Sequence, residues 1–435
     1  TNLASVTFLG NAPTIGNNAV FIGVPSGATA FRAANLTGYG ADGSNFNGLV
    51  VETPGTFTVT NNSDSGTGSL RQAIINANTT AGNDQINFSL TGSSSYTITL
   101  AAALPNIVDA NAVVGAGTAG TVTITGLGAS SLIIDANQGS YSIFTINTGA
   151  DFTISGVTVT GANTSGNGGA FNNQGNLTVD SSIISDNNAT IYGGGIFSNG
   201  NLTVTNSTIS RNASFEGGGV FNTGTLAVTN STLYDNTAYI GGGISNSQGI
   251  LTVSNSTLSG NSASGAFGFG GGIYNRDNLT ITNSTISGNS ATSGGGIYNN
   301  SGAINIANTI IANSISGGDF AGNQPVSSTN NLVEDGSISG AIAADPLLGP
   351  LQDNGGPTFT MALFAGSPAI GAADGAISNT APVNGLDQRG YVRSSTTPSI
   401  GAYEFLNATQ VALTTPASGS DYMESQVVLR QIEFV

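Results

Sequence analysis

Residues 194–212 read GGIFSNGNLTVTNSTISRN, and two further stretches repeat the same phrase: GGVFNTGTLAVTNSTLYDN at 218–236 and GGIYNRDNLTITNSTISGN at 271–289. Six such units lie between Gly168 and Ser314, and their paired glycines recur after 26, 24, 24, 29 and 24 residues. A fixed period in the twenties is typical of stacked solenoid units. The repeat therefore predicts the architecture of the chain before any question of chemistry arises.

Apolar residues alternate with polar ones inside each unit, as in Leu202 and Val204 or Leu279 and Ile281. Such alternation predicts short strands with one buried face. Three short strands for roughly 24 residues predict an all-β fold, a right-handed parallel β-helix, because a propeller blade needs about 40 residues or more and a leucine-rich repeat has another leucine spacing. Weaker alternation upstream extends the pattern, so we expect ten or eleven coils from Phe57 to about Asn313.

Four regions follow from the change of pattern along the chain. Residues 1–56 are predicted to form a small N-terminal module, and residues 57–345 the parallel β-helix. Near 69–78, Leu70, Ala73, Ile74 and Ala77 recur at helical spacing after Ser69, which predicts a short helix that caps the exposed end of the coils. Residues 346–405 are predicted to be closing coils, a C-terminal cap, and residues 406–435 a linker with a strand-like tail.

Alignment of the units predicts columns of identical side chains. Asp180 heads a first column, which continues with Asn206, Asn230, Asn255, Asn283 and Asn308; the second contains Asn187, Asn212, Asn236, Asn261, Asn289 and Asn313. Coils lie about 4.8 Å apart, so stacked amides can bond one another as a ladder. Asparagine also tolerates the left-handed backbone of a sharp corner, and glycine triplets such as 193–195 serve another corner. The inward column is predicted to be Ile196, Val220, Ile244, Ile273 and Ile297.

Charged and aromatic residues form columns of their own. Asp186, Arg211 and Asp235 precede the second asparagine column in three consecutive units, which predicts a stack of acid, base and acid; we interpret it as an exposed ion-pair ladder rather than a binding site. A line of aromatic residues can stack on sugars or form a buried stack, here interrupted by Ser245, and we favour burial. The aromatic residues concerned are Phe197, Phe221, Tyr274 and Tyr298.

Composition excludes several partners. The chain has 23 acidic residues and 7 basic ones, and its net charge of −16 argues against binding to nucleic acid or to an anionic membrane. The chain contains no run of 18 apolar residues, so its sequence does not predict membrane insertion. There is also no cysteine to form a disulfide. The chain opens on Thr1 without a signal-like segment, which is typical of a processed or excised piece.

The chemical candidates are few. Glycan-cleaving β-helices need clustered carboxylates, whereas the acidic residues here are scattered and Asp180, Asp186 and Asp235 fall in different columns or two coils apart. Histidine and lysine are absent, which removes the commonest bases and metal ligands. Glu334 with Asp335, and Asp353 with Asn354, match no calcium loop and are interpreted as solvated turns. We therefore expect no enzyme, no metal and no cofactor, with a carbohydrate-binding or polysaccharide-cleaving β-helix as the alternative.

Several segments resemble bacterial surface proteins. The pairing of GG-[AIV]-[FYS] with [IL]-x-x-N resembles repeats of polymorphic outer-membrane and adhesin-like β-helix proteins. GSLRQA at 68–73, followed by NDQINF at 83–88, resembles the C-S-L-R-E-A motif of secreted β-helix proteins, with Gly68 in place of Cys and Gln72 in place of Glu. Residues 345–374 and 386–405 resemble their closing block, in which Met361 stands for a usual His and Gly371 for a usual Asp. The first fifty residues resemble the end of bacterial-surface leucine-rich-repeat proteins.

The resemblance implies an extracellular or cell-surface location and an architecture, but little chemistry. We expect a structural or adhesive protein whose partners are other copies of itself or surface glycans. The apolar tail could add a strand to a neighbouring subunit and so build a filament head to tail. Its candidate contact residues are Val427, Val428, Leu429, Ile432 and Phe434.

Overall fold

A computed structural model describes residues 54–80, 82–109 and 120–406, together with the backbone of four strands nearer the N-terminus. Those four strands form one small sheet in the order β1-β2-β4-β3. Their bounds are Ser5–Phe8 (β1), Thr29–Arg32 (β2), Asn45–Phe46 (β3) and Leu49–Glu52 (β4). The tail residues Val427, Val428, Leu429, Ile432 and Phe434 lie outside the described residues.

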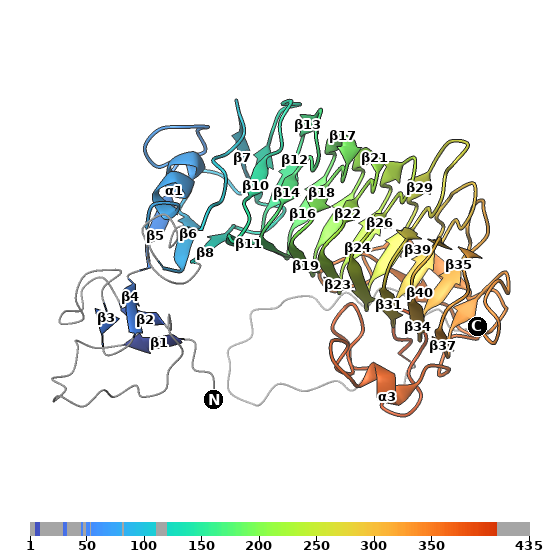
Figure 1. Ribbon diagram of the computed structural model, residues 1–435. Helices are drawn as coiled ribbons and strands as arrows, with labels where there is room; N and C mark the ends of the chain where they lie inside the picture. Colours follow the sequence, from blue (N-terminus) through green and yellow to red (C-terminus); the bar gives the residue numbers. More distant parts are fainter. Residues whose placement is uncertain are drawn as a thin grey trace. The chain divides into compact units, whose positions relative to one another are not determined.

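The fold is a parallel β-helix, as the repeat predicts, and its successive coils are stacked side by side in Figure 1. Sheet 1 contains eleven strands, one for each coil. They are β5 (Thr56–Val59), β6 (Asp84–Phe88), β8 (Thr121–Thr125), β11 (Asp151–Ser155), β15 (Asn176–Asp180), β19 (Asn201–Thr205), β23 (Thr225–Thr229), β27 (Ile250–Ser254), β31 (Leu279–Thr282), β34 (Ile304–Ala307) and β37 (Ser327–Thr329).

Sheet 2 follows sheet 1 in each coil and contains ten strands. They are β7 (Tyr96–Thr99), β9 (Leu132–Asp135), β12 (Thr158–Thr160), β16 (Ile183–Ser185), β20 (Thr208–Ser210), β24 (Thr232–Tyr234), β28 (Thr257–Ser259), β32 (Thr285–Ser287), β35 (Ile310–Ala312) and β38 (Leu332–Val333). Because the strands pair in parallel without slips, equivalent residues of neighbouring coils lie directly above one another.

Two further sheets complete the coils. Sheet 3 has eight strands and sheet 4 has five. Sheet 3 consists of β10 (Phe144–Ile146), β14 (Phe171–Asn173), β18 (Ile196–Ser198), β22 (Val220–Asn222), β26 (Ile244–Asn246), β30 (Ile273–Asn275), β33 (Ile297–Asn299) and β36 (Phe320–Gly322). Sheet 4 consists of β13 (Asn163–Thr164), β17 (Asn188–Tyr192), β21 (Ala213–Glu216), β25 (Thr237–Ala238) and β29 (Ser262–Ala263).

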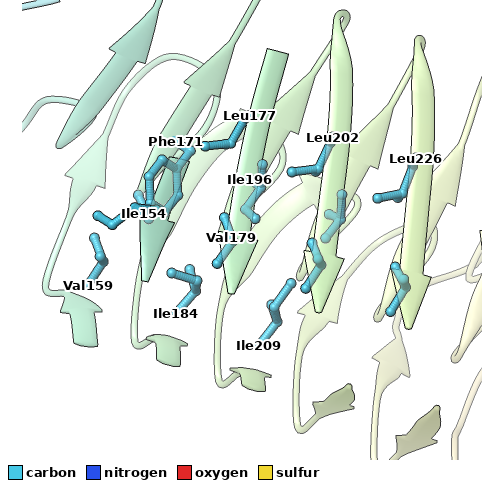
Figure 2. Packing of buried hydrophobic residues seen from close by; sticks show 14 of the residues in the cluster. Ile154, Val159, Phe171, Leu177, Val179, Ile184, Ile196, Leu202, Ile209 and Leu226 are labelled. Carbon is cyan, nitrogen blue, oxygen red and sulfur yellow. The ribbon is translucent and has the colours of Figure 1, made fainter. Parts of the chain in front are cut away.

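One apolar side chain after another fills the interior of the coils (Figure 2). The predicted inward column from Ile196 to Ile297 is fully buried. A glycine triplet leads from sheet 4 to sheet 3, and a Cβ at Gly218 would lie only 2.4 Å from the carbonyl oxygen of Thr237 and 2.5 Å from that of Gly242. Side chains are therefore excluded at this corner by the backbone of the next coil.

The predicted capping helix is confirmed as α1 (Leu70–Ala77), which packs against β5 and β6. The Ser69 hydroxyl accepts a hydrogen bond from the Gln72 N–H at the start of the helix, and Leu70, Ala73, Ile74 and Ala77 are buried. With eight residues, α1 is far shorter than the roughly 20 residues of a membrane-spanning helix, and no described helix could span a bilayer.

Residues 346–404 do not continue the coils as we predicted. Their strands β39 (Leu348–Gln352) and β40 (Thr360–Leu363) pair antiparallel with each other, and a short helix follows, α3 (Gly375–Ser378). The segment instead folds back along coils that precede it by up to 157 residues, where Gln388 donates to the carbonyl oxygen of Ser231 and Arg393 donates to Asn255. We call residues 346–404 the C-terminal block.

Candidate binding cleft

A cleft of about 290 Å³ lies where the C-terminal block meets sheet 2. Its floor is the outer face of β16, β20 and β24, on three consecutive coils, and its C-terminal wall is Pro357–Phe359. Because the core side chains of these strands point inward, the cleft receives the alternate residues, among them Thr208 and Ser210. The cleft thus exists because the C-terminal block covers the later coils of sheet 2 and stops there.

Arg211 is the only charged residue that lines this cleft. Its Nε and Nη2 donate to the two carboxylate oxygens of Asp186 at 2.8 Å each, and its Nη1 donates to the Tyr234 hydroxyl at 3.1 Å. The bonds from Arg211 lower the pKa of Asp186, and the same bonds raise the pKa of Arg211. A guanidinium has five N–H donors, so two remain beyond these three bonds.

Two aromatic rings, those of Tyr234 and Phe359, also line the cleft. The rings of Tyr234 and Phe359 are stacked with centroids 6.3 Å apart, and Phe359 is 44% exposed. Two hydrogen bonds hold the Phe359 backbone, because its carbonyl oxygen accepts from the Thr232 hydroxyl at 2.6 Å and from Gln388 Nε2 at 3.1 Å. The exposed ring is therefore presented from a fixed backbone.

Small polar groups complete the lining. Ser181, Asn206, Thr208 and Ser210 all border the cleft. The Ser210 hydroxyl is buried and has no hydrogen-bond partner among the described residues. Asp180 flanks the cleft and accepts from Asn206 Nδ2 at 3.0 Å, so the amide is held in one orientation. The arrangement supplies hydroxyl, amide and guanidinium groups beside an apolar ring, within one small cavity.

Only two members of the predicted acid–base–acid stack form an ion pair. Asp186, Arg211 and Asp235 do occupy the same corner, with φ of 56°, 53° and 54°, and their backbone N–H groups bond equivalent carbonyls of the next coil. Among the described residues, however, Arg211 pairs only with Asp186. The predicted column is therefore confirmed, but the ion-pair ladder is not continuous, because Arg211 Nη1 donates to Tyr234 rather than to Asp235.

The second asparagine column is a continuous ladder. Each Nδ2 donates to the Oδ1 of the next coil at 2.9–3.1 Å, from Asn187 through Asn212, Asn236 and Asn261 to Asn289. Asn313 does not belong to it: Asn313 has φ of 55° and follows Ala312, the partner of Ser287, so it occupies the corner position and Ser314 takes the ladder position. Our placement of Asn313 was one residue out of register.

The first asparagine column is a corner rather than a ladder. All five residues from Asn206 to Asn308 have φ between 47° and 52°, and Ser181, not Asp180, is the equivalent residue one coil earlier. Asn255 donates to Asn230 and Asn308 donates to Asn283, so the column contains bonded pairs rather than a continuous ladder. Asn283 and Asn308 also both donate to Ser378 of the C-terminal block. A second continuous ladder, which we did not predict, lies on sheet 3 and is formed by Asn222, Asn246, Asn275 and Asn299 with bonds of 2.9 Å.

The aromatic column lies as we favoured, buried or half-buried. Phe221 and Tyr274 are buried, and Phe197 and Tyr298 are half-buried. Rings from the preceding loops cover them: Tyr192 lies 4.4 Å from Phe221 and Phe269 lies 4.6 Å from Tyr298, between ring centroids. Ser245 interrupts the column and donates to Glu216, a buried carboxylate.

Acidic residues lie close together near the last coil. Asp319 and Asp335 each accept a hydrogen bond from the other's backbone N–H, and Glu334 accepts from the Asn313 N–H. Burial raises the pKa of Asp319. No group of three potential metal-ligating side chains occurs in the described ranges. The cluster ties together the backbone of the last coil, and Asp353 caps a turn at Gly355.

Comparison with known proteins adds one match. No protein-family model and no curated protein matches the chain. Among solved structures, the chain is similar to "Crystal structure of pectate lyase Pel9A", at 15% identity and a TM-score of 0.46, over 80% of this chain and 96% of that one. At this level, neither activity nor site residues carry over to this chain.

The matched protein is nevertheless an enzyme, and this finding contradicts our expectation that the chain is not one. That expectation rested on scattered carboxylates and on the absence of His and Lys. It is corrected here, because arginine, tyrosine and isolated carboxylates can also move protons or stabilise charge, and the cleft contains the first two.

Proposed function

We propose that the protein binds carbohydrate in the cleft between sheet 2 and the C-terminal block. One observation carries the proposal: the exposed Phe359 ring and Arg211, which Asp186 holds from outside the cavity, border the same cavity, over a floor of hydroxyl and amide groups. A pyranose ring has apolar C–H faces and a rim of hydroxyl groups. Aromatic rings pack on the former, and planar side chains with paired donors or acceptors bond the latter.

The dimensions support a short stretch of a glycan. The cavity of about 290 Å³ is at the small end of ligand pockets, and its floor extends over three coils, which at about 4.8 Å per coil is close to 10 Å from first to last. The resemblance to secreted β-helix proteins supports an extracellular setting, in which glycans are abundant. Self-assembly through the tail stays a prediction, since those residues lie outside the described part of the chain.

The test is a titration of the whole chain with glycans immobilised on an array and then, in solution, with the oligosaccharides that bind. Phe359→Ala is expected to weaken binding at least tenfold, because it removes the only exposed ring of the cleft. Phe364→Ala is the matched control, since Phe364 is 55% exposed on the same block but does not line the cleft. Equal loss in both variants, or no glycan bound by the unaltered chain, contradicts the proposal.

The same samples should be examined for cleavage. After prolonged incubation, new reducing ends or unsaturated sugar products would show that the cleft also breaks the glycan that it binds. Arg211 and Tyr234 are then the first residues to replace, because both bear polar groups next to the bound chain.

A further inference from the structure

A line of exposed apolar side chains crosses the coils on sheet 4 and the loops that follow it. It consists of Ile191, Phe215, Tyr239 and Phe267, whose exposed fractions are 43%, 49%, 53% and 72%. We call these four residues the apolar stripe. Isolated apolar residues on a surface are ordinary, but a contiguous exposed group of them marks an interaction site.

The stripe is narrow, with one side chain on each of four consecutive coils, so at about 4.8 Å per coil it spans roughly 14 Å. Its centre is the best-defined part: the Tyr239 N–H donates to the Phe215 carbonyl oxygen, and the two rings are stacked with centroids 5.4 Å apart. Phe267 lies on the longer loop after β29, where Ser264 is the residue in register with Tyr239. The Phe215–Tyr239 stack follows the direction in which the coils stack.

Packing within the coils does not account for the stripe. A separate stack of Tyr192, Phe197 and Phe221 already fills the space between sheets 4 and 3. The Phe215 and Tyr239 rings are about half exposed, and each leaves apolar surface in water that a serine in its place would not. The neighbouring exposed residues are Thr190, Thr237 and Thr292.

The stripe carries no charge on a chain whose net charge is −16. In strands β17, β21, β25 and β29 the single charged residue is Glu216, which is buried and bonded to Ser245. An uncharged surface of this kind suits an uncharged ligand, because a charged one would lose hydration without gaining a partner.

The stripe and the cleft flank the same corner of the coils. Arg211, which lines the cleft, directly follows β20, and Phe215 of the stripe lies four residues later on β21. The Asp186–Arg211 pair therefore lies between the two surfaces. A ligand too long for the cleft has the stripe as the nearest exposed apolar surface around that corner.

We propose that the apolar stripe is a second contact surface for a long uncharged glycan, and this inference rests on carbohydrate binding by the cleft. Four half-exposed side chains offer on the order of 400 Å² of surface, given that aromatic residues bury about 150–250 Å² each. A protein partner normally covers about 800 Å² on each side. A narrow stripe one residue wide matches an extended chain of sugars better than a folded protein.

The experiment compares a long probe with a short one. Galactomannan and soluble β-glucan serve as neutral polysaccharides, and their disaccharide fragments, which are short enough for the cleft alone, serve as short ligands. The double variant Phe215→Ser/Tyr239→Ser is expected to bind the disaccharide as tightly as the unaltered chain does, and to bind the parent polysaccharide at least tenfold more weakly. Unchanged circular dichroism and an unchanged thermal midpoint show that the variant is folded.

The outcomes separate the two proposals. Phe359→Ala should weaken both ligands; if it weakens neither while the double variant still loses the polysaccharide, the cleft proposal fails and the stripe stands. Equal polysaccharide binding by the double variant and the unaltered chain overturns the stripe. So does a dimer of the unaltered chain that the double variant converts to a monomer, since the stripe is then a protein contact. Absence of binding to all four probes overturns it as well.

Discussion

Three consecutive coils turn the corner beside the cleft on Asp186, Arg211 and Asp235, where other coils use Gly161, Gly260 and Gly288. All of these residues have φ between about 50° and 80°. A left-handed backbone costs a residue with a side chain roughly 1–2 kcal/mol, and glycine almost nothing. The exposed Asp186–Arg211 ion pair contributes only about 0–1 kcal/mol to the stability of the fold. Arginine at this corner is therefore better explained by what its side chain contacts than by stability.

Replacing Arg211 by glycine should separate stability from binding. Arg211→Gly is expected to leave the thermal midpoint unchanged or higher, because backbone strain is relieved, while glycan affinity falls at least tenfold, which is about 1.4 kcal/mol. Scanning calorimetry and titration calorimetry give the two quantities.

Asp235→Gly is the matched control for this corner, since Asp235 has φ of 54° but no ion pair with Arg211. Its affinity should equal that of the unaltered chain. Equal loss of affinity in the two variants, or a large loss of stability in Arg211→Gly, would show that the corner acts through the fold and not through the ligand.

The sequence could predict the contact of Arg211 with Asp186 but not its surroundings. A fixed period places both residues at the same corner of neighbouring coils, so their proximity follows from alignment alone. Phe359 comes from a segment without repeats, and its approach to Tyr234 depends on how the C-terminal block folds back. Nothing in the periodic pattern contains that information.

Among the elements, the asparagine ladder fixes the turn from sheet 2 to sheet 4. The Oδ1 of Asn236 accepts from both the backbone N–H and the Nδ2 of Asn212 at 3.0 Å, and its own Nδ2 donates to the Ile209 carbonyl oxygen at 2.9 Å. These groups are buried, so water cannot replace a missing partner. The ladder therefore supplies hydrogen bonds that the strands themselves cannot form at the corner.

Asn236→Ala is expected to lower the free energy of unfolding by about 3 kcal/mol or more, because each buried polar group left without a partner costs about 1–3 kcal/mol. Urea unfolding followed by circular dichroism measures the change. Asn199→Ala is the control: Asn199 is exposed in a turn of the same repeat, and its loss should cost less than about 0.5 kcal/mol. Similar costs for both substitutions would mean that the ladder adds nothing to stability.

Prediction of the ladders depended on how the repeat units were aligned with one another. The spacing within the units predicts the ladder from Asn187 to Asn289, but Asn313 follows Asn308 by only five positions, where the other units have six, and so takes the corner itself. The ladder from Asn222 to Asn299 could have been predicted too, because its asparagine ends the Gly-Gly-apolar-X-Asn phrase in several units. Both features follow from the spacing of the asparagines, which the sequence contains.

The whole molecule contains two kinds of order, one that repeats from coil to coil and one that does not. The coils repeat, and each is paired with its immediate neighbours in up to four sheets. The C-terminal block does not repeat and contacts four coils at once through residues such as Gln388, Arg393 and Ser378. Periodicity predicts the first kind of order, while long-range contacts between dissimilar segments are required for the second. The cleft depends on both, which is why sequence alone placed its floor but not its wall.

A solenoid whose coils contact only their neighbours should tolerate removal of one complete coil. Deletion of residues 151–175 joins Ala150 to Asn176, which is the residue paired with Asp151, so β8 can pair with β15 in the register that it now has with β11. The shortened chain is expected to fold, with the same circular dichroism per residue and a thermal midpoint only a few degrees lower. Deletion of residues 151–162 removes half a coil instead and places β13 where a strand of sheet 1 is needed. That variant should fail to fold, because inward side chains beyond the junction no longer lie above their equivalents in the preceding coil. If it folds as well as the full-coil deletion, or if neither variant folds, stability does not reside in independent coils.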